Sequence, residues 1–131
     1  MNSFACSEAF VTLATQKLDK IVAFYTVLFE STPKVYKPNT YAEFLTPGLK
    51  LGIFQPCLNN FVEFAASSSG AMSLCLEVED LDAAIAHLIA SGYPPSGVPV
   101  TASHGREIYA YDPDGNRLIL HQGITPIADD M

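Results

Sequence analysis

Two stretches of the sequence share one design. The ten residues from Phe10 read FVTLATQKLD, and the ten residues from Ser73, which begin 63 positions later, read SLCLEVEDLD. Each stretch has an apolar segment, a polar turn and a Leu-Asp pair, which is the pattern of a strand that leads into a helix. The shared order of these features predicts one structural unit that occurs twice in the chain.

The ends of the two units also correspond. Residues 50–55 read KLGIFQ and residues 117–122 read RLILHQ, at an offset of 67 positions. Each segment follows a turn that contains proline, at residues 46–48 in the first unit and at residues 112–116 in the second. The second turn reads DPDGN, and an Asp-Gly pair between two apolar segments is typical of a β-hairpin.

Each unit is expected to contain one strand, one helix and then three short strands. The helices are predicted at residues 18–29 and 81–90, where apolar residues recur at helical spacing. Their apolar faces consist of Ile21, Phe24, Tyr25 and Leu28 in the first helix and Leu81, Ala84, Ile85 and Leu88 in the second, which Gly92 ends. The strands are predicted at residues 10–15, 33–37, 41–46 and 49–54, and at residues 72–78, 98–101, 106–111 and 117–121. Residues 55–70 join the two units, and the Ser-Ser-Ser-Gly run at 67–70 is expected to be the most flexible part.

The composition is that of a folded domain without a preference for anionic partners. Apolar residues make up 49% of the 131 residues, charged residues make up 16%, and the formal net charge is −7. An acidic surface repels phosphate, so neither nucleic acid nor a membrane surface is expected as a partner. The chain has no apolar run of roughly 20 residues and no secretory pattern at its beginning. We therefore expect one cytoplasmic domain spanning residues 1–131.

The cysteines do not suggest a disulfide framework or a metal knuckle. Their number is odd, and Cys6, Cys57 and Cys75 lie far apart in the sequence. We expect buried or semi-buried free thiols in a reducing compartment.

The segment at residues 111–120, which reads YDPDGNRLIL, resembles the last hairpin of the vicinal oxygen chelate superfamily. That superfamily includes glyoxalase I, bleomycin-resistance proteins, fosfomycin-resistance enzymes and ring-cleaving dioxygenases. The strand-to-helix openings at residues 11–25 and 76–84 are similar to those of the family, and the resemblance covers about residues 8–122. It implies an α+β fold in which two βαβββ modules, about residues 8–55 and 71–122, form an incompletely closed eight-stranded mixed barrel. The resemblance also implies a homodimer and a site on the concave face of the sheet.

The resemblance further indicates where family metalloenzymes hold a divalent metal ion. The two ligand positions on first strands correspond to Phe10 and Ser73, and the two glutamate positions on last strands correspond to Gly52 and Ile119. None of these four residues is a usual metal ligand. We therefore predict that the purified protein carries no stoichiometric metal and needs no cofactor.

A binding surface is predicted in place of the metal. Strand residues alternate between two faces, so the face that holds these four positions also holds Thr12, Phe54, Cys75, Glu77 and His121. Such an apolar and aromatic wall with a few polar groups is typical of ligand pockets and resembles the antibiotic-sequestering branch of the family. We predict metal-independent binding of a small organic ligand, aromatic or cationic in character. The predicted ligand contacts are Phe10, Thr12, Phe54, Ser73, Cys75, His104, Tyr109, Ile119 and His121.

Other interpretations remain open at this point. The same residues could form ordinary core packing that fills the cleft. The protein could instead be a glyoxalase-like lyase or isomerase, or a dioxygenase-like enzyme, with a relocated or metal-free active site. In that case His121 would act as general base beside Glu77 or Cys75, although no catalytic residue is assigned. A displaced metal site built from His104, His121 and Glu77 has no support from spacing, and His87 on the second helix is expected to be structural.

Overall fold

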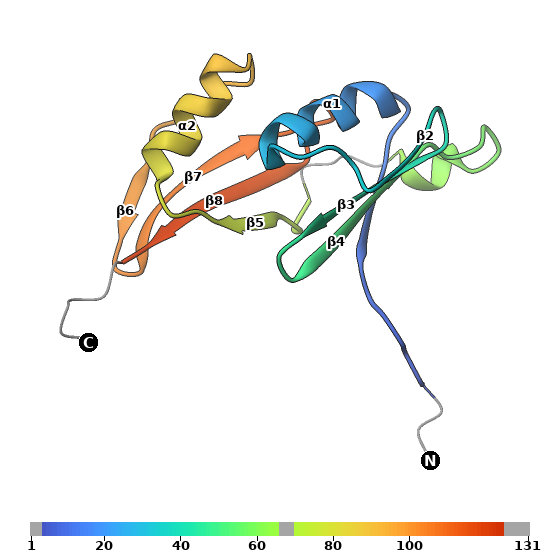
Figure 1. The fold of residues 1–131 in the computed structure, drawn as a ribbon, viewed down its shortest axis with the longest axis horizontal. Helices are drawn as coiled ribbons and strands as arrows, with labels where there is room; N and C mark the ends of the chain where they lie inside the picture. Colours follow the sequence, from blue (N-terminus) through green and yellow to red (C-terminus); the bar gives the residue numbers. More distant parts are fainter. Residues whose placement is uncertain (1–3, 66–69, 125–131) are drawn as a thin grey trace. The chain divides into compact units, whose positions relative to one another are not determined.

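The computed structural model describes residues 4–65 and 70–124, and each of these two ranges forms one compact unit. Each unit is a βαβββ module with one helix over a four-stranded mixed sheet (Figure 1). The first unit, module one, contains β1 (Val11–Ala14), α1 (Leu18–Phe29), β2 (Val35–Lys37), β3 (Tyr41–Thr46) and β4 (Leu49–Phe54), followed by a short 3-10 helix, η1 (Phe61–Phe64). The second, module two, contains β5 (Leu74–Glu77), α2 (Leu81–Ala90), β6 (Val100–Ala102), β7 (Gly105–Tyr111) and β8 (Arg117–Gly123). The predicted α+β fold with two βαβββ modules is confirmed.

The two sheets have the same topology and the same register. The strand orders are β1-β4-β3-β2 and β5-β8-β7-β6, and in each sheet the first pair is parallel while the others are antiparallel. Thr12 pairs with Gly52 in module one, and Cys75 pairs with Ile119 in module two. The offsets of 63 and 67 positions therefore relate residues that are structurally equivalent.

Helix α1 packs against its sheet through an aromatic core. Its fully buried side chains include Phe24 and Tyr25, and on the sheet Phe44 is only 1% exposed. The Tyr25 ring stacks on Phe29 with centroids 5.7 Å apart and lies 6.2 Å from Phe44. The predicted helix boundaries are confirmed, and the helix ends where Glu30 adopts a left-handed conformation. Leu28, expected on the buried face, is only half-buried, because it lies in the last turn of α1, one residue before the helix ends.

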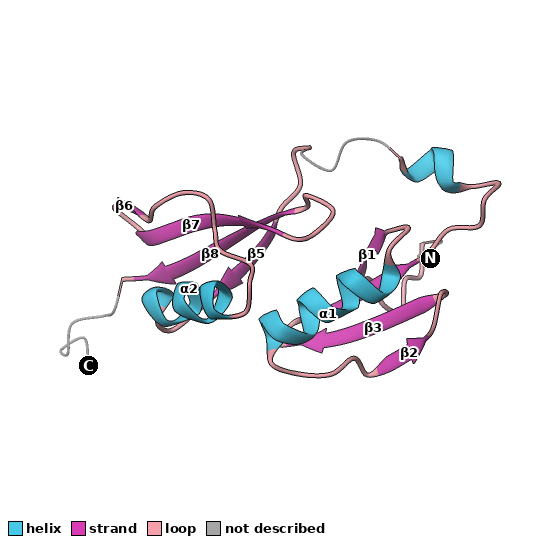
Figure 2. Cartoon of the chain, turned by 90° about the horizontal axis from the view of Figure 1, so that it is seen from above, coloured by secondary structure: helices cyan, strands magenta, loops and turns pink. Residues whose placement is uncertain are grey.

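Helix α2 has an aliphatic core and better-defined ends. The Asp80 carboxylate accepts a hydrogen bond from the backbone N–H of Ala83 and caps the first turn. Leu81 and Leu88 are fully buried, and they pack on the helix side of a sheet whose core residues include Leu118, Leu120, Ile108 and Ala110. Gly92, with φ near +91°, ends the helix as predicted. Figure 2 shows each helix lying along its own sheet.

The structure differs from the sequence predictions at a few strand ends and in the joint. The strand expected at 98–101 begins at Val100 instead, because the preceding Pro99 has no N–H to donate to a ladder. The joint, expected to be a loop, contains η1, whose Phe64 ring meets Phe54 edge to face at 5.1 Å. Most of the predicted flexible run lies outside the described residues.

The expectation for the cysteines was wrong in one respect. Cys6, Cys57 and Cys75 are free thiols, but all three are exposed. Cys6 and Cys57 lie outside the strands and helices, and Cys75 is on β5 with its side chain away from α2. Across residues 4–65 and 70–124, no helix has the length and apolar character that a bilayer span requires.

Candidate functional site

Each sheet has one face covered by its helix and one helix-free face. In β4, Leu51 and Ile53 are buried beneath α1, so the alternate residues Lys50, Gly52 and Phe54 belong to the helix-free face. The same alternation in β8 buries Leu118 and Leu120. It therefore places Arg117, Ile119 and His121 on the helix-free face of module two.

A charged and aromatic network occupies the helix-free face of module one. The Lys50 ammonium lies 4.7 Å from the centroid of the Phe10 ring, in cation–π geometry. It pairs with the Glu8 carboxylate at 2.8 Å and lies 3.8 Å from the Glu43 carboxylate. The hydrogen bond to Glu8 raises the pKa of Lys50 above its ordinary value. Phe10, predicted as a ligand contact, is thus 45% exposed and already in contact with a cation from its own chain.

Gly52 leaves room for a tyrosine ring in the same network. The Tyr41 hydroxyl donates a hydrogen bond of 2.9 Å to Glu43, and its ring lies over Gly52. A Cβ atom added at Gly52 would come within 3.0 Å of that hydroxyl oxygen and within 3.3 Å of a Thr12 methyl carbon. Burial and the hydrogen bond to Glu43 raise the pKa of Tyr41. A neighbouring side chain therefore takes the space above Gly52.

On the helix-free face of module two, an arginine side chain donates hydrogen bonds to residues that precede β5. The Arg117 guanidinium donates to the Ser73 hydroxyl at 3.0 Å and to the Gly70 carbonyl at 2.9 Å. Cys75, Ile119 and Tyr109 then form one row across the sheet, since Ile119 pairs with both of the others. Cys75 and Tyr109 are exposed, whereas Ile119 is half-buried. This row holds apolar and weakly polar groups.

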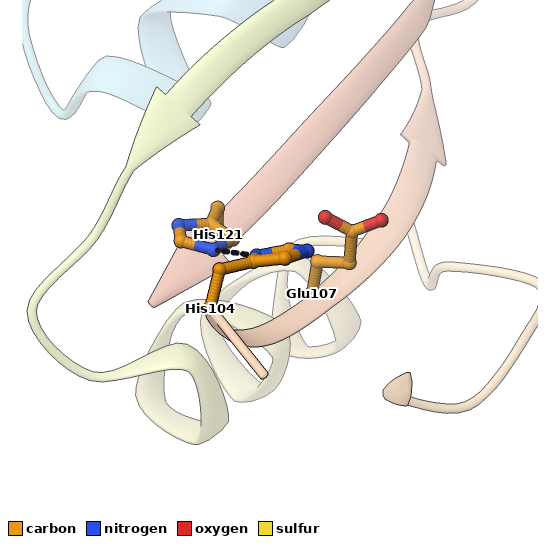
Figure 3. Close-up of side chains that lie close together, drawn as sticks. All are labelled: His104, Glu107 and His121. Carbon is orange, nitrogen blue, oxygen red and sulfur yellow. Dashed lines mark hydrogen bonds between the residues drawn. The ribbon is translucent and has the colours of Figure 1, made fainter. Parts of the chain in front are cut away.

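The next row on this face brings together ionisable side chains. His121 pairs with Glu77 on one side and with Glu107 on the other. His104, in the turn between β6 and β7, places its Nδ1 atom 2.9 Å from His121 Nε2, and the two imidazole rings meet edge to edge with centroids 5.1 Å apart and an interplanar angle of 26°. One ligand atom from each of His104, Glu107 and His121 lies within 4.8 Å of the others (Figure 3). We call these three residues the His-Glu-His cluster.

Glu77 orients His121 from the outer strand. One of its carboxylate oxygens lies 2.6 Å from His121 Nδ1, and the other accepts a 2.7 Å hydrogen bond from the backbone N–H of Gly123. The hydrogen bond with His121, followed by that from Gly123, lowers the pKa of Glu77. The carboxylate is therefore ionised at neutral pH and can only accept hydrogen bonds, so His121 Nδ1 carries the proton. In the neutral form of His121, the unprotonated nitrogen is then Nε2, which lies 2.9 Å from His104 Nδ1.

A glycine explains why His104 lies over β8. Gly105 is buried with φ near +138°, a conformation that residues with a side chain rarely adopt. A Cβ atom at this position would collide with the backbone carbonyl oxygen of Gln122. Close approach of the two backbones lets the turn carry His104 onto the helix-free face.

The four positions that the family resemblance assigned to metal ligands do not fit a metal ion. Gly52 offers no donor atom, and its surroundings are filled by the Tyr41 ring. The phenyl ring of Phe10 is engaged with Lys50, and Ile119 is apolar. Ser73, the only one with a donor atom, accepts a hydrogen bond from Arg117. These residues provide no first coordination shell.

The sequence predictions identified part of this arrangement. His104 and His121 were proposed as ligand contacts, and the structure brings them into direct contact; Glu77, placed on the same face, also joins them. Phe10, Thr12 and Phe54 lie in module one, whereas Ser73, Cys75, Tyr109 and Ile119 lie on the helix-free face of module two. Glu107 was missed, although strand alternation places it on the same face as Tyr109, which was among the predicted contacts. The network of charged groups in module one was not predicted either, because Glu8 and Lys50 are far apart in the sequence.

Comparison with known proteins identifies the family of the chain and several solved structures that are similar to it. Residues 9–120 match the family model described as the Glyoxalase/Bleomycin resistance protein/Dioxygenase superfamily. No curated protein sequence matches the chain at a significant level.

The structural relatives share the fold over nearly their whole length. A glyoxalase/bleomycin resistance protein from Catenulispora acidiphila is 26% identical with a TM-score of 0.66, over 90% of this chain and 97% of the other. A protein of Agrobacterium tumefaciens is 27% identical with a TM-score of 0.71, over 88% of this chain and 96% of the other. A bleomycin-binding protein, whose structure was solved with bleomycin, is 21% identical with a TM-score of 0.65, over 91% of this chain and 100% of the other. At that level of identity the last comparison shows the fold alone.

Proposed function

The chain belongs to the glyoxalase/bleomycin resistance protein/dioxygenase superfamily, and we propose that it binds a small organic molecule on its helix-free sheet faces. We propose that this binding requires no metal ion at the four positions where family metalloenzymes have their metal ligands. The observation that carries this proposal is the occupation of those positions by Phe10, Gly52, Ser73 and Ile119. A family member that binds bleomycin shows that the fold accommodates a small-molecule ligand.

The chemistry of the two faces favours a flat, partly cationic ligand. Exposed or half-buried rings are available at Phe10, Phe54 and Tyr109, with His121 and His104 as polar contacts. Phe10 already holds the Lys50 ammonium, so a cationic ligand would compete with that group for the ring. The proposed contacts also include Thr12, Ser73, Cys75 and Ile119, whose side chains share these faces.

The ligand proposal is tested by a thermal-shift screen of aromatic and cationic compounds in the presence of a chelator. For a confirmed ligand, Phe54→Leu should weaken binding about threefold to tenfold, since an aromatic contact contributes about 0.5–1.5 kcal/mol beyond its buried area. Tyr36→Leu is the control: Tyr36 is a half-exposed ring of the same sheet, but its pairing with Ala42 places it on the helix side. Equal losses in both variants, or none in Phe54→Leu, would contradict the assignment of the helix-free face. If no compound shifts the melting temperature, a face filled by its own side chains becomes the better explanation.

We propose in addition that the protein is a cytoplasmic homodimer in which the chain acts as one glyoxalase-like domain. Strands β1, β2, β5 and β6 lie at the edges of their sheets, and exposed edges favour pairing with another copy. Sedimentation at concentrations on the order of tens of micromolar should show a dimer, and a monomer alone would contradict it.

A second candidate function is proton-transfer chemistry by a lyase-like or isomerase-like enzyme. The supporting observation is the hydrogen-bonded series Glu77–His121–His104, in which the carboxylate orients an imidazole whose neutral form can accept a proton. His121 would be the general base. The test is exchange of α-hydrogens of small carbonyl compounds for deuterium, followed by NMR. Exchange no faster than in buffer, for wild type and His121→Gln alike, would eliminate this candidate.

A further inference from the structure

We propose that His104, Glu107 and His121 form a binding site for a divalent transition-metal ion. This site lies entirely within module two and differs from the positions at which the family resemblance placed a metal. It goes beyond the proposed ligand binding, because it depends on no organic ligand and on no residue of module one.

The arrangement of donor atoms supports the proposal first. Two imidazole nitrogens and one carboxylate oxygen lie within 4.8 Å of one another, and the two nitrogens are 2.9 Å apart. Metal–nitrogen bonds of about 2.0–2.1 Å in a tetrahedral site separate two ligand atoms by roughly 3.3 Å. The two nitrogens would therefore separate by a few tenths of an ångström to admit the ion, and the carboxylate oxygen, which lies within 4.8 Å of them, would approach by up to about 1.5 Å. His104 is exposed in a turn and has the freedom to make this movement.

The hydrogen bonds around His121 also favour coordination. Glu77 accepts the proton of His121 Nδ1, which leaves the lone pair of neutral His121 on Nε2, the atom that lies 2.9 Å from His104 Nδ1. A carboxylate that orients a histidine in this way is the usual outer partner of a metal-binding imidazole. Glu77 is itself held by the N–H of Gly123, so the orientation of His121 is fixed before any ion arrives.

The proton on His104 can be accounted for. With both rings neutral and the His121 proton on Nδ1, His121 Nε2 is the acceptor in the hydrogen bond between the rings and His104 Nδ1 is the donor. When an ion binds to both nitrogens, neutral His104 transfers this proton through solvent to its own Nε2 atom. No oxidation and no net loss of a proton are required.

The charges near the site attract a cation. Glu77 and Glu107 both lie beside His121, and the whole chain has a formal net charge of −7. The neighbouring Arg106 belongs to the opposite face of β7 by alternation, and its guanidinium pairs with Asp82 of α2 at 3.1 Å. The strongest nearby positive charge is therefore directed away from the site.

The donor set indicates which ions would bind. Two imidazoles and one carboxylate suit zinc, nickel or cobalt better than magnesium or calcium, which prefer oxygen ligands. Three protein ligands leave at least one coordination position for water or for a donor atom of a small molecule.

The experiment is a titration of the chelator-treated full chain with Zn²⁺, followed by isothermal calorimetry. Wild type should bind a single equivalent, and His121→Gln and His104→Gln should each lose most of the affinity. Glu77→Gln, which removes only the outer partner, should weaken binding about 10-fold to 100-fold. His87→Gln is the control, since His87 lies on α2 away from the cluster and should leave binding unchanged.

Folding of each variant is checked by circular dichroism and melting temperature before titration. Should His121→Gln not fold, Glu107→Gln takes its place, because this half-buried side chain is the third ligand. The proposal is overturned if wild type binds no Zn²⁺ equivalent, or if the folded cluster variants bind it as tightly as His87→Gln does. Neither result affects the test of organic ligand binding, which is carried out with chelator present.

Discussion

The two modules share a backbone plan but carry different chemistry at the same row of their sheets. In module two the row contains Glu77, His121 and Glu107, and in module one the equivalent row contains Ala14, Phe54 and Tyr41. The strand pairing is the same in both. A duplicated unit can therefore keep its register while its helix-free faces diverge, one toward aromatic contacts and the other toward ionisable groups.

The neighbouring row shows what both modules have in common. Here module one has Thr12, Gly52 and Glu43, and module two has Cys75, Ile119 and Tyr109. Neither row offers a set of metal ligands, although the family resemblance places metal ligands on Gly52 and Ile119. The histidine and carboxylate groups of module two lie one row further along the strands, so any metal chemistry would be displaced from the family position.

The largest expected effect concerns the cores, which are aromatic in module one and aliphatic in module two. Phe44→Ala should reduce the free energy of unfolding by about 3–5 kcal/mol, because it leaves a cavity beside Tyr25 and Phe29. Leu88→Ala should cost about 2–5 kcal/mol in module two, and less than Phe44→Ala. Urea unfolding measures both values. A larger loss for Leu88→Ala would mean that the two cores contribute in the opposite order.

A smaller effect is expected at the turns that close the last hairpin of each module. The buried Asp112 carboxylate accepts hydrogen bonds from the backbone N–H groups of Asp114 and Asn116 and from the Asn116 side chain. The corresponding Thr46 donates to the Leu49 carbonyl. Asp112→Ala should destabilise by about 1–3 kcal/mol, since it leaves several donors without this acceptor, and Thr46→Val by about 0.5–1.5 kcal/mol. Equal losses in thermal unfolding would show that the Asp-Pro-Asp-Gly-Asn turn is no more stabilising than its counterpart.

The smallest effect is the pH dependence of a surface ion pair that is specific to module two. The hydrogen bond from Arg106 lowers the pKa of Asp82, so the folded state binds the proton less readily than the unfolded chain. The stabilisation is present above the ordinary aspartate pKa and is lost as the pH falls through the lowered value. Asp82→Asn should therefore flatten the acid side of the stability curve slightly. An unchanged curve would show that solvent screens the pair completely.

The sequence predicted the repeated module well because its signals are local. The helix boundaries at Leu18–Phe29 and Leu81–Ala90 follow from apolar periodicity and from Gly92, and the register follows from two matched offsets. Alternation along β8 also placed His121 on the helix-free face. The contact between His121 and His104 could not be read in this way, because it depends on the backbone conformation at Gly105, which no periodic pattern reports. Glu107 required the pairing of β7 with β8 before its position beside His121 became visible.

The exposure of the cysteines is a further example. Cys75 occupies a strand whose apolar sequence suggests burial, yet its side chain lies on the face away from α2. Composition alone cannot distinguish the two faces of a strand. The distinction needs the helix in place, which buries Leu118 and Leu120 but not Ile119.

The central claim is that module two contains a metal-competent His-Glu-His cluster that has no counterpart among residues 4–65, the described part of module one. The most direct measurement is NMR of the histidine side-chain nitrogens in ¹⁵N-labelled protein, recorded before and after addition of Zn²⁺. We predict that His121 coordinates through Nε2 with its Nδ1 still protonated toward Glu77, that His104 coordinates through Nδ1, and that the signals of His87 stay unchanged. Zn²⁺ binding that leaves the nitrogen signals of His104 and His121 unmoved, or that shifts His87 instead, would contradict the account.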